Sequence, residues 1–369
     1  REDMARNTPA SPKVRTPAAL TPALEQLGRV LGALGHGEVT DPLALGITAD
    51  EQDRFERAIA EAAARNGWFS QENVRHALTG IAHLLETQGL RDWLSGYPDL
   101  GTVDPRTVGL VLAGNLPLVG FHDLLCVLLS GHDARVKLSA QDAVLLPAVV
   151  ELLARLEPEI TERVAFTQEP LGQVDAVIAT GSNNTARYFE HYFKHLPHII
   201  RRNRVSVAVL DGSETEAELA ALGEDVFRYF GLGCRNVAKL YVPQDFDLDR
   251  FFRAIFPWQH IAGHNKYANN LDYHRALWLL DGADLLENGF LLLKEDSALA
   301  SPVGSLYYER YTDRLEVDRV LAERAHEVQC IVGHGQVPFG RSQFPGPADY
   351  ADGLDTLAFL QGLGQGTNS

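Results

Sequence analysis

Apolar residues recur at helical spacing through the first part of the chain. Residues 50–67 have the sequence DEQDRFERAIAEAAARNG, with Asp50 as a candidate N-cap and Gly67 as a C-terminal stop. Residues 70–94 repeat the pattern behind a second candidate cap, Ser70. We therefore expect the stretch from residue 20 to residue 98 to be helical.

Apolar runs of strand length then alternate with amphipathic segments. Residues 107–118, TVGLVLAGNLPL, form an apolar strand that ends in a Gly-Asn-x-Pro turn. Further strands are predicted at 133–139, 174–182 and 205–212, and helices at 121–132, 141–158 and 183–196. Strands that alternate with helices of this length are typical of right-handed βαβ units on a parallel sheet. The sequence therefore predicts an α/β fold.

A second unit begins at about residue 205–213. It starts with a predicted helix at 215–233, followed by a strand at 237–243 and a helix at 248–256. Residues 264–274, rich in side-chain amides, are expected to form a loop. Later strands are predicted at 274–280, 289–294, 305–311 and 327–335.

Composition narrows the class of protein. The 369 residues carry a formal net charge of −16, which disfavours nucleic acid as a partner because phosphate binding needs a basic surface. Three cysteines, an odd and sparse set, argue against a disulfide scaffold and for a reducing compartment. No apolar run approaches the roughly 20 residues of a membrane span. We expect a cytoplasmic protein with no membrane span, and residues 1–19 as a tag remnant or mobile arm.

Three predicted turns carry unusual polar residues. Ligands of open α/β sheets bind at the carboxyl ends of the strands, where these turns lie. They contain Asn115; Lys137 and Ser139; and Thr180, Gly181 and Ser182. Neither a G-x-G-x-x-G turn nor a phosphate-binding P-loop occurs, and any one of these turns alone could be a plain helix cap.

The three cysteines differ in their surroundings. Cys234 follows Gly233 on a predicted turn just ahead of an apolar strand, which is unusual for a buried thiol. Cys126 falls within an apolar helix and Cys330 within an apolar strand, and we expect both to be buried. Cys234 is therefore the candidate nucleophile.

Several of these segments resemble one family. The sequences AGNLPLVGFHDLL, ARVKLSAQDAVLLP, DAVIATGSNNTARYF, NRVSVAVL and FGLGCRNVAKLYVP are similar, in order and spacing, to the LuxC-type acyl-CoA reductases of the aldehyde dehydrogenase superfamily. The similarity runs over about residues 105–360, and VPFGRSQFPGPADYADGLDTLAFL resembles the end of this family's sequences.

The resemblance implies a role for each matching residue. Cys234 matches the catalytic nucleophile, and Asn115 matches the amide that forms the oxyanion hole with the backbone N–H of the nucleophile. Lys137, with Ser139 nearby, matches the contact to the adenosine ribose of the cofactor. The turn of Thr180, Gly181 and Ser182 matches the one that binds the pyrophosphate. Glu295, seven residues before Pro302 and so farther than usual, corresponds to the glutamate that binds the nicotinamide ribose.

One departure from aldehyde-oxidising relatives is informative. Those relatives have a Glu-Leu-Gly-Gly motif whose glutamate activates water, whereas no carboxylate lies between His198 and Leu210 here. The resemblance thus implies reduction of a fatty acyl-CoA to an aldehyde through a thioacyl-cysteine, with NADPH favoured over NADH. A CoA-acylating aldehyde dehydrogenase, an acyl carrier protein thioester reductase and a non-catalytic acyl-binding scaffold remain alternatives.

The same resemblance implies a domain organisation. We expect N-terminal helices and a cofactor-binding domain at residues 20–208, a catalytic domain at 209–340, and a C-terminal segment at 341–369 that contacts the cofactor domain or another subunit. Relatives form dimers or tetramers, so a homodimer or homotetramer is expected.

Two further groups of residues can each be interpreted in two ways. Arg201, Arg202 and Arg204 form the densest basic run, either as phosphate contacts for cofactor or coenzyme A or as ion-paired residues. His260 and His264 have a spacing that could bind zinc on a helix, but no carboxylate or thiol completes a set. We therefore predict no metal.

Overall fold

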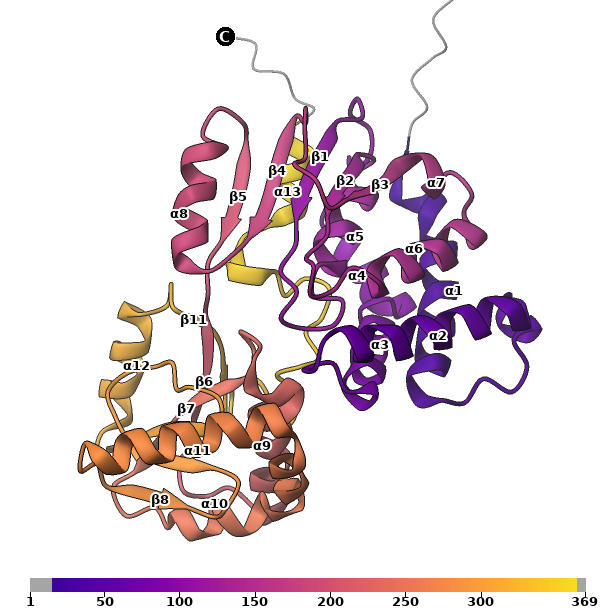
Figure 1. Ribbon diagram of the computed structural model, residues 1–369. Helices are drawn as coiled ribbons and strands as arrows, with labels where there is room; N and C mark the ends of the chain where they lie inside the picture. Colours follow the sequence, from indigo (N-terminus) through magenta and orange to yellow (C-terminus); the bar gives the residue numbers. More distant parts are fainter. Residues whose placement is uncertain (1–14, 364–369) are drawn as a thin grey trace, which may run out of the picture.

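Five parallel strands form the first sheet of the computed structural model, which describes residues 15–363 (Figure 1). Their order is β3-β2-β1-β4-β5. They are β1 (Thr107–Val111), β2 (Asp133–Lys137), β3 (Val164–Thr167), β4 (Ala176–Thr180) and β5 (His198–Arg201). Because all neighbouring strands run parallel, their carboxyl ends meet at one edge of the sheet.

Helices cover both faces of this sheet, which explains its uninterrupted apolar strands. Phe193 and partly buried residues of α8 pack on one face, whereas α5 and the C-terminal helix α13 pack together on the other. These helices are α5 (Phe121–Leu129), α8 (Asn183–Tyr192) and α13 (Thr356–Gly362), with α6 (Leu145–Leu156) and α7 (Ile160–Arg163) between β2 and β3.

Four N-terminal helices lie beside the first sheet (Figure 1). They are α1 (Pro17–His36), α2 (Ala49–Arg65), α3 (Gln71–Leu84) and α4 (Thr87–Ser95), with a short 3₁₀ turn, η1 (Leu43–Leu45), between the first two. Helix α2 begins with a capping box in which Thr48 and Glu51 satisfy each other's backbone N–H groups. Their apolar faces join one core with the first sheet.

The second sheet has six strands in the order β11-β6-β7-β10-β9-β8. They are β6 (Val205–Val209), β7 (Val237–Pro243), β8 (Leu285–Glu287), β9 (Leu292–Glu295), β10 (Ser305–Tyr311) and β11 (Val328–Val332). All run parallel except β8, which is antiparallel to β9.

Helices also cover the second sheet on both faces. Helix α9 (Glu216–Phe227), α10 (Leu248–Ala254) and α11 (Asn265–Leu280) contribute to one apolar cluster, and α12 (Arg314–Glu323) contributes to another. Three short 3₁₀ segments complete the fold: η2 (Arg228–Gly231), η3 (Phe256–Gly263) and η4 (Ala351–Gly353).

The structure differs from the sequence predictions at several boundaries. Residues 1–14 of the predicted arm lie outside the described residues, but residues 17–19 already belong to α1. Strand β6 pairs with β7 in the second sheet, so the two sheets divide before residue 205 and not at 208/209. Thr48, not Asp50, caps α2. The short strands β3, β5 and β8 were not predicted.

One predicted strand and one predicted loop are wrong. Residues 264–274 and 274–280 together span helix α11. Its buried residues Tyr267, Leu271 and Trp278 lie four and seven positions apart, which is the spacing of one helical face. The apolar run that resembled a strand is the end of this helix, where Leu279 and Leu280 are exposed.

Candidate active site

Cys234 lies on a tight loop between α9 and β7, at the amino end of β7. We call residues 228–236 the cysteine loop. The helix predicted to continue to residue 233 ends at Phe227, because Tyr229, Phe230 and Gly231 have left-handed backbones, with φ of 56°, 58° and 75°. Two consecutive bulky residues in this conformation store strain, which typically accumulates at functional sites.

Asn236 stabilises the cysteine loop from inside. Its side chain is only 2% exposed; Oδ1 accepts a hydrogen bond from Gly233 N–H at 2.8 Å, and Nδ2 donates to the carbonyl oxygen of Arg228, also at 2.8 Å. Nδ2 also lies 3.2 Å and 3.3 Å from the carbonyl oxygens of Asp225 and Val226. One buried amide therefore joins the end of α9 to the residue before Cys234.

Asn115 reaches the cysteine loop from the first sheet. It follows β1, and its Nδ2 donates a hydrogen bond to the carbonyl oxygen of Leu232 at 3.1 Å. The neighbouring Leu116 packs against Gly233 so closely that a Cβ there would lie 2.8 Å from Leu116 Cδ1. The turn after β1 that carries Asn115 is thus in contact with the loop that carries Cys234.

Residue Cys234 is partly exposed, and its thiol lies among opposing charges. Burial raises its pKa, Arg235 lowers the pKa, and the Asp352 carboxylate and Cys330 raise it again. Asp352, on η4, forms an ion pair with Arg204 at 3.1 Å. The C-terminal segment therefore supplies a carboxylate near the thiol. The absence of a carboxylate from residues 198–210 did not reveal it, because Asp352 is distant in sequence.

Ser206 links the two cysteines of the second sheet. Its hydroxyl donates to the carbonyl oxygen of Cys234 at 2.9 Å and lies 3.1 Å from Cys330 Sγ. Cys330 was expected to be buried, but it is partly exposed and lines a cavity. Cys126, in contrast, is fully buried in the core as expected.

The predicted cofactor contacts share the carboxyl edge of the first sheet. Lys137 ends β2 and Thr180 ends β4, while Gly181 and Ser182 lead into α8 and Ser139 follows β2. The register aligns the ends of the three strands. Val111 at the end of β1 pairs with Lys137 of β2 on one side and with Ala179 of β4 on the other. The structure brings these residues to one edge.

Most of these side chains already have protein partners. Lys137 Nζ donates to the Gln168 carbonyl oxygen at 2.9 Å, and Ser139 Oγ accepts from the Gln141 N–H at 3.2 Å. Ser182 caps α8 by accepting from the Thr185 N–H at 3.3 Å. Ser182 is therefore a helix cap, which is one of the two interpretations of this turn. Its contact with a cofactor stays a prediction.

The edge nevertheless fits a dinucleotide. A Cβ on Gly114 would lie 2.3 Å from Ser139 Oγ, so glycine is required where the turn after β1 approaches the turn after β2. A Cβ on Gly181 would lie 2.9 Å from Thr185 Cβ at the start of α8. A helix start with free N–H groups, an ammonium group and hydroxyls suits pyrophosphate and ribose.

The arginine run is largely structural. Arg201 is only 3% exposed and pairs with Asp123 at 2.7 Å, which agrees with the ion-paired alternative and not with a contact to a ligand phosphate. It also donates to the Ala351 carbonyl and the Thr356 hydroxyl of the C-terminal segment. Arg202 pairs with Glu190 at 2.6 Å and Arg204 with Asp352, so each already has a carboxylate partner.

Glu295 lies away from the cysteine loop. It ends β9, paired with Tyr308 of β10, whereas Cys234 precedes the amino end of β7 in the same parallel sheet. Because β9 and β10 run parallel, the chain returns from the carboxyl end of β9 to the amino end of β10. Glu295 and Pro302 therefore lie at opposite ends of these strands. Pro302, not Glu295, lines a small cavity with Gly231 of the cysteine loop.

The two histidines of the possible zinc pair have other roles. His260 contacts the Pro257 carbonyl, and His264 caps α11 while its Nε2 lies 2.7 Å from the Gly67 carbonyl oxygen. Among residues 15–363, Asp211, Glu214 and His334 bring three possible ligand atoms within 4.8 Å of one another. It follows β6 and β11, at the edge of the second sheet opposite Cys234.

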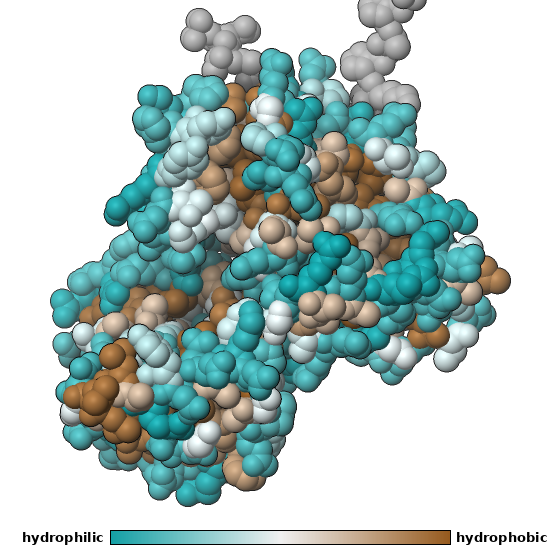
Figure 2. Space-filling model, viewed as in Figure 1, coloured by the Kyte–Doolittle hydropathy of each residue, from teal (hydrophilic) through white to brown (hydrophobic). Residues whose placement is uncertain are grey.

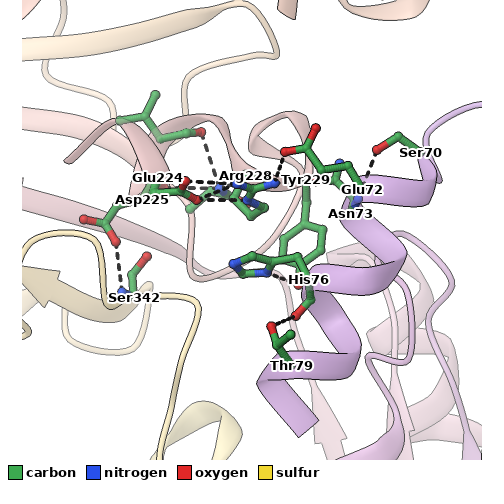
Figure 3. A network of polar contacts seen from close by, with 12 residues as sticks. Ser70, Glu72, Asn73, His76, Thr79, Glu224, Asp225, Arg228, Tyr229 and Ser342 are labelled. Carbon is green, nitrogen blue, oxygen red and sulfur yellow. Dashed lines mark hydrogen bonds and ion pairs between the residues drawn. The ribbon is translucent and has the colours of Figure 1, made fainter. Parts of the chain in front are cut away.

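Figure 3 shows a polar network that attaches the cysteine loop to α3. Arg228 bonds to Glu72 of α3 at 2.7 Å and to Glu224 of α9 at 2.9 Å. The hydroxyl of Tyr229 lies 3.0 Å from His76 Nδ1. None of these residues was singled out from the sequence, because their pairing depends on chain segments far apart.

Asp225 attaches the C-terminal segment to the same helix end. Its fully buried carboxylate accepts from Gly340 N–H at 2.6 Å and from Ser342 N–H at 2.9 Å (Figure 3). Burial raises the pKa of Asp225 to about 6 despite these bonds. The only indication of this contact in the sequence was a carboxylate among apolar positions of a helix.

No helix in the described part of the chain is long and apolar enough to cross a membrane.

Solved aldehyde dehydrogenases share this fold. The NAD-dependent enzyme from Sinorhizobium meliloti is similar with a TM-score of 0.61 and 13% identity, over 88% of this chain and 71% of that chain. The enzyme from Mycobacterium tuberculosis complexed with NAD+ gives 0.59 and 15%, over 88% and 73%. ALDH21 from Physcomitrella patens, in complex with the reaction product succinate, gives 0.60 and 11%, over 95% and 87%. The expected fold class is confirmed.

The family comparison agrees with the sequence resemblance. No curated protein matches the chain. The family model described as acyl-CoA reductase (LuxC) matches residues 48–254, a span that includes Asn115 and Cys234 but not Glu295. Because this match covers more than half of the sequence, the chain belongs to the acyl-CoA reductase (LuxC) family and is an oxidoreductase acting on aldehyde or acyl groups, with an aldehyde dehydrogenase fold.

Proposed function

We propose that this protein reduces fatty acyl-CoA to fatty aldehyde with NADPH, through a thioacyl intermediate on Cys234. The observation that supports this most strongly is the contact between Asn115 and the cysteine loop. Attack of a thiol on a thioester needs an amide donor close to the nucleophile, and the Asn115 amide contacts the loop that carries Cys234.

Acylation of Cys234 is the first step. The sulfur attacks the thioester carbonyl, the bond from that carbon to the coenzyme A sulfur breaks, and coenzyme A leaves as its thiol with the proton from Cys234. Asn115 Nδ2 and the Cys234 N–H stabilise the oxyanion, each donor contributing roughly 3 kcal/mol to the transition state. Arg235 favours the reactive thiolate, because it lowers the thiol pKa against the effect of burial.

The first sheet binds the cofactor in this proposal. Gly181, Ser182 and the start of α8 contact the pyrophosphate, and Lys137 and Ser139 contact the adenosine ribose. When bound, NADPH would supply the hydride that converts the thioacyl group to the oxyanion of a thiohemiacetal. Cys234 then leaves as the thiolate and the aldehyde is released.

Asp352 bears on the competing reaction with water. It is the carboxylate whose charge acts on the Cys234 thiol, and it is paired with Arg204 at 3.1 Å. Burial raises the pKa of Asp352, whereas the charges of Arg201 and Arg204 lower it. In this proposal the ion pair with Arg204 holds the carboxylate away from water, so hydrolysis of the thioacyl group is slow. The acyl group therefore persists until it is reduced.

We also propose a homo-oligomer in the cytoplasm. Figure 2 shows a group of apolar side chains at the lower left of the molecule, in the region of α11 and β8. The exposed large apolar residues of these elements are Tyr273, Leu277, Leu279, Leu280 and Leu286. Exposed apolar patches of this kind mark interfaces between proteins.

The test of the proposed function is NADPH oxidation with acyl-CoA of several chain lengths. We expect aldehyde formation that depends on both substrates, and no turnover by Cys234→Ala. Turnover by Cys234→Ala at the wild-type rate, or no aldehyde from the wild-type protein with any acyl-CoA, would refute the proposal.

A further inference from the structure

Two cavities share Arg341 and Phe344 of the C-terminal segment. The inner cavity, about 490 Å³, is also lined by Arg235, Cys330 and Tyr350. The outer cavity, about 560 Å³, lies over α1 and α3. Both volumes fall within the range of small-molecule sites, roughly 300–1,000 Å³.

Cys234 itself does not line the inner cavity, but residues next to it do. Arg235 is the next residue after Cys234, and Cys330 is bonded through the Ser206 hydroxyl to the Cys234 carbonyl oxygen. Gly353, beside Asp352, also lines this cavity, and the charge of Asp352 acts on the thiol. A thioester in the inner cavity would therefore lie near Cys234.

The two arginines of the inner cavity have no carboxylate partner among residues 15–363. Arg235 Nη1 donates only to the Ser342 carbonyl oxygen, at 3.4 Å, and the Arg341 guanidinium lies 4.8 Å from the centre of the Phe344 ring. Asp349 also lines the cavity, but its carboxylate accepts from the Gly346 N–H at 2.7 Å. In a chain with net charge −16, two such guanidinium groups at one cavity favour an anionic ligand.

The outer cavity adds further basic groups at its rim. Besides Arg341 it is lined by Arg29, His36 and His83. Its acidic residues are Glu25 and Glu86, and Glu86 is paired with His83 at 3.1 Å. The basic side chains thus continue outward from the nucleophile over helices α1 and α3.

We propose that these two cavities form the binding site for the coenzyme A part of acyl-CoA. The pantetheine arm lies in the inner cavity, with its thioester at Cys234, and the phosphates bind Arg341 and the outer cavity. This inference rests on the proposed function. None of the residues that line either cavity belongs to the predicted cofactor edge, so acyl-CoA and NADPH bind without displacing each other.

The test compares donors with and without phosphates. Acylation of Cys234 by dodecanoyl-CoA and by S-dodecanoyl pantetheine, which lacks every phosphate, is followed by intact mass without cofactor. Arg341→Gln should raise the half-saturating concentration of dodecanoyl-CoA about tenfold, because a charge-assisted phosphate contact is lost. The value for the pantetheine thioester should not change.

Two matched variants exclude a general effect. Arg341→Lys keeps the charge and should recover most of the affinity for dodecanoyl-CoA. Arg91→Gln removes an exposed arginine of α4 outside both cavities and should change neither donor. Thermal melting of each variant checks that it is folded.

Two outcomes would overturn the inference: an equal change for both donors, or an unchanged value for dodecanoyl-CoA with Arg341→Gln. The second includes the case in which only an acyl carrier protein thioester is affected. If the wild-type protein is not acylated by either donor, the proposed function itself fails, and that result is distinct from the other two.

Discussion

The side-chain amide of Asn115 donates a hydrogen bond to the carbonyl oxygen of Leu232, 3.1 Å away. This bond connects the turn after β1 in the first sheet to the loop that carries Cys234 in the second. Leu116 packs on Gly233 at the same place, so the approach is close along both residues. The position of the proposed oxyanion donor relative to the nucleophile therefore depends on how the two sheets meet.

Replacing Asn115 with alanine tests the oxyanion hole. We expect kcat for acyl-CoA reduction to fall about 100- to 1,000-fold, because one of two donors to the oxyanion is lost. The loss of the bond to Leu232 should lower the free energy of unfolding by only about 1 kcal/mol. Steady-state kinetics and urea denaturation measure the two effects.

Asn269→Ala, an exposed asparagine of α11, is the control for Asn115→Ala. It should leave both quantities within error of the wild type. An Asn115→Ala protein that keeps its kcat would show that another group stabilises the oxyanion.

Asn236→Ala tests the support of the cysteine loop. The substitution leaves the buried Gly233 N–H and the Arg228 carbonyl without their partner, so we expect the free energy of unfolding to fall by about 2–4 kcal/mol. Acylation of Cys234 should slow as well, because the loop backbone is strained without that amide. Urea denaturation and acylation rates check both, and stability within 0.5 kcal/mol (roughly the surface-mutation range) of the wild type would contradict the assigned role.

The half-buried His76 and the buried Asp225, both near the cysteine loop, have opposite effects on stability as the pH changes. Burial lowers the pKa of His76 from 6.5 to about 4, so its contribution is present above pH 6.5 and is lost as the pH falls toward 4. Burial raises the pKa of Asp225 from 3.8 to about 6, so its contribution is present below pH 3.8 and is lost as the pH rises through 6. Each amounts to roughly 3 kcal/mol.

Single substitutions should separate the two effects. In His76→Gln, the free energy of unfolding at pH 6.5 minus that at pH 4.5 should fall by roughly 2 kcal/mol relative to the wild type. In Asp225→Asn the same difference should rise. Urea denaturation at both pH values gives the measurement, and a His76→Gln protein with the wild-type pH dependence would refute the assigned pKa.

The local features of the site could be predicted from the sequence. Apolar strands ending in polar turns placed Lys137 and Thr180 at the carboxyl edge of a parallel sheet, because the direction of such strands is set by the βαβ connection. A glycine before Cys234 marked a tight turn. These inferences use neighbours in sequence only, and the structure agrees with the placement.

Features that depend on long-range contacts were missed or wrong. For Arg201 the sequence left a ligand phosphate or an ion pair open, because it does not place the partner, Asp123, beside this residue. Glu295 was matched to the family pattern although it lies farther from Pro302 along the chain than usual, and the parallel pairing of β9 and β10 puts the two residues at opposite ends of these strands. Asp352 approaches Cys234 only because the C-terminal segment returns to the cysteine loop.

The most direct test of the central claim is the intact mass of the protein after incubation with dodecanoyl-CoA in the absence of NADPH. We expect the wild-type protein and Cys330→Ala to gain one dodecanoyl group each, Cys234→Ala to gain none, and NADPH to remove the label as aldehyde. Labelling of Cys234→Ala without NADPH, or no labelling of Cys330→Ala, would contradict the assignment of Cys234 as the nucleophile.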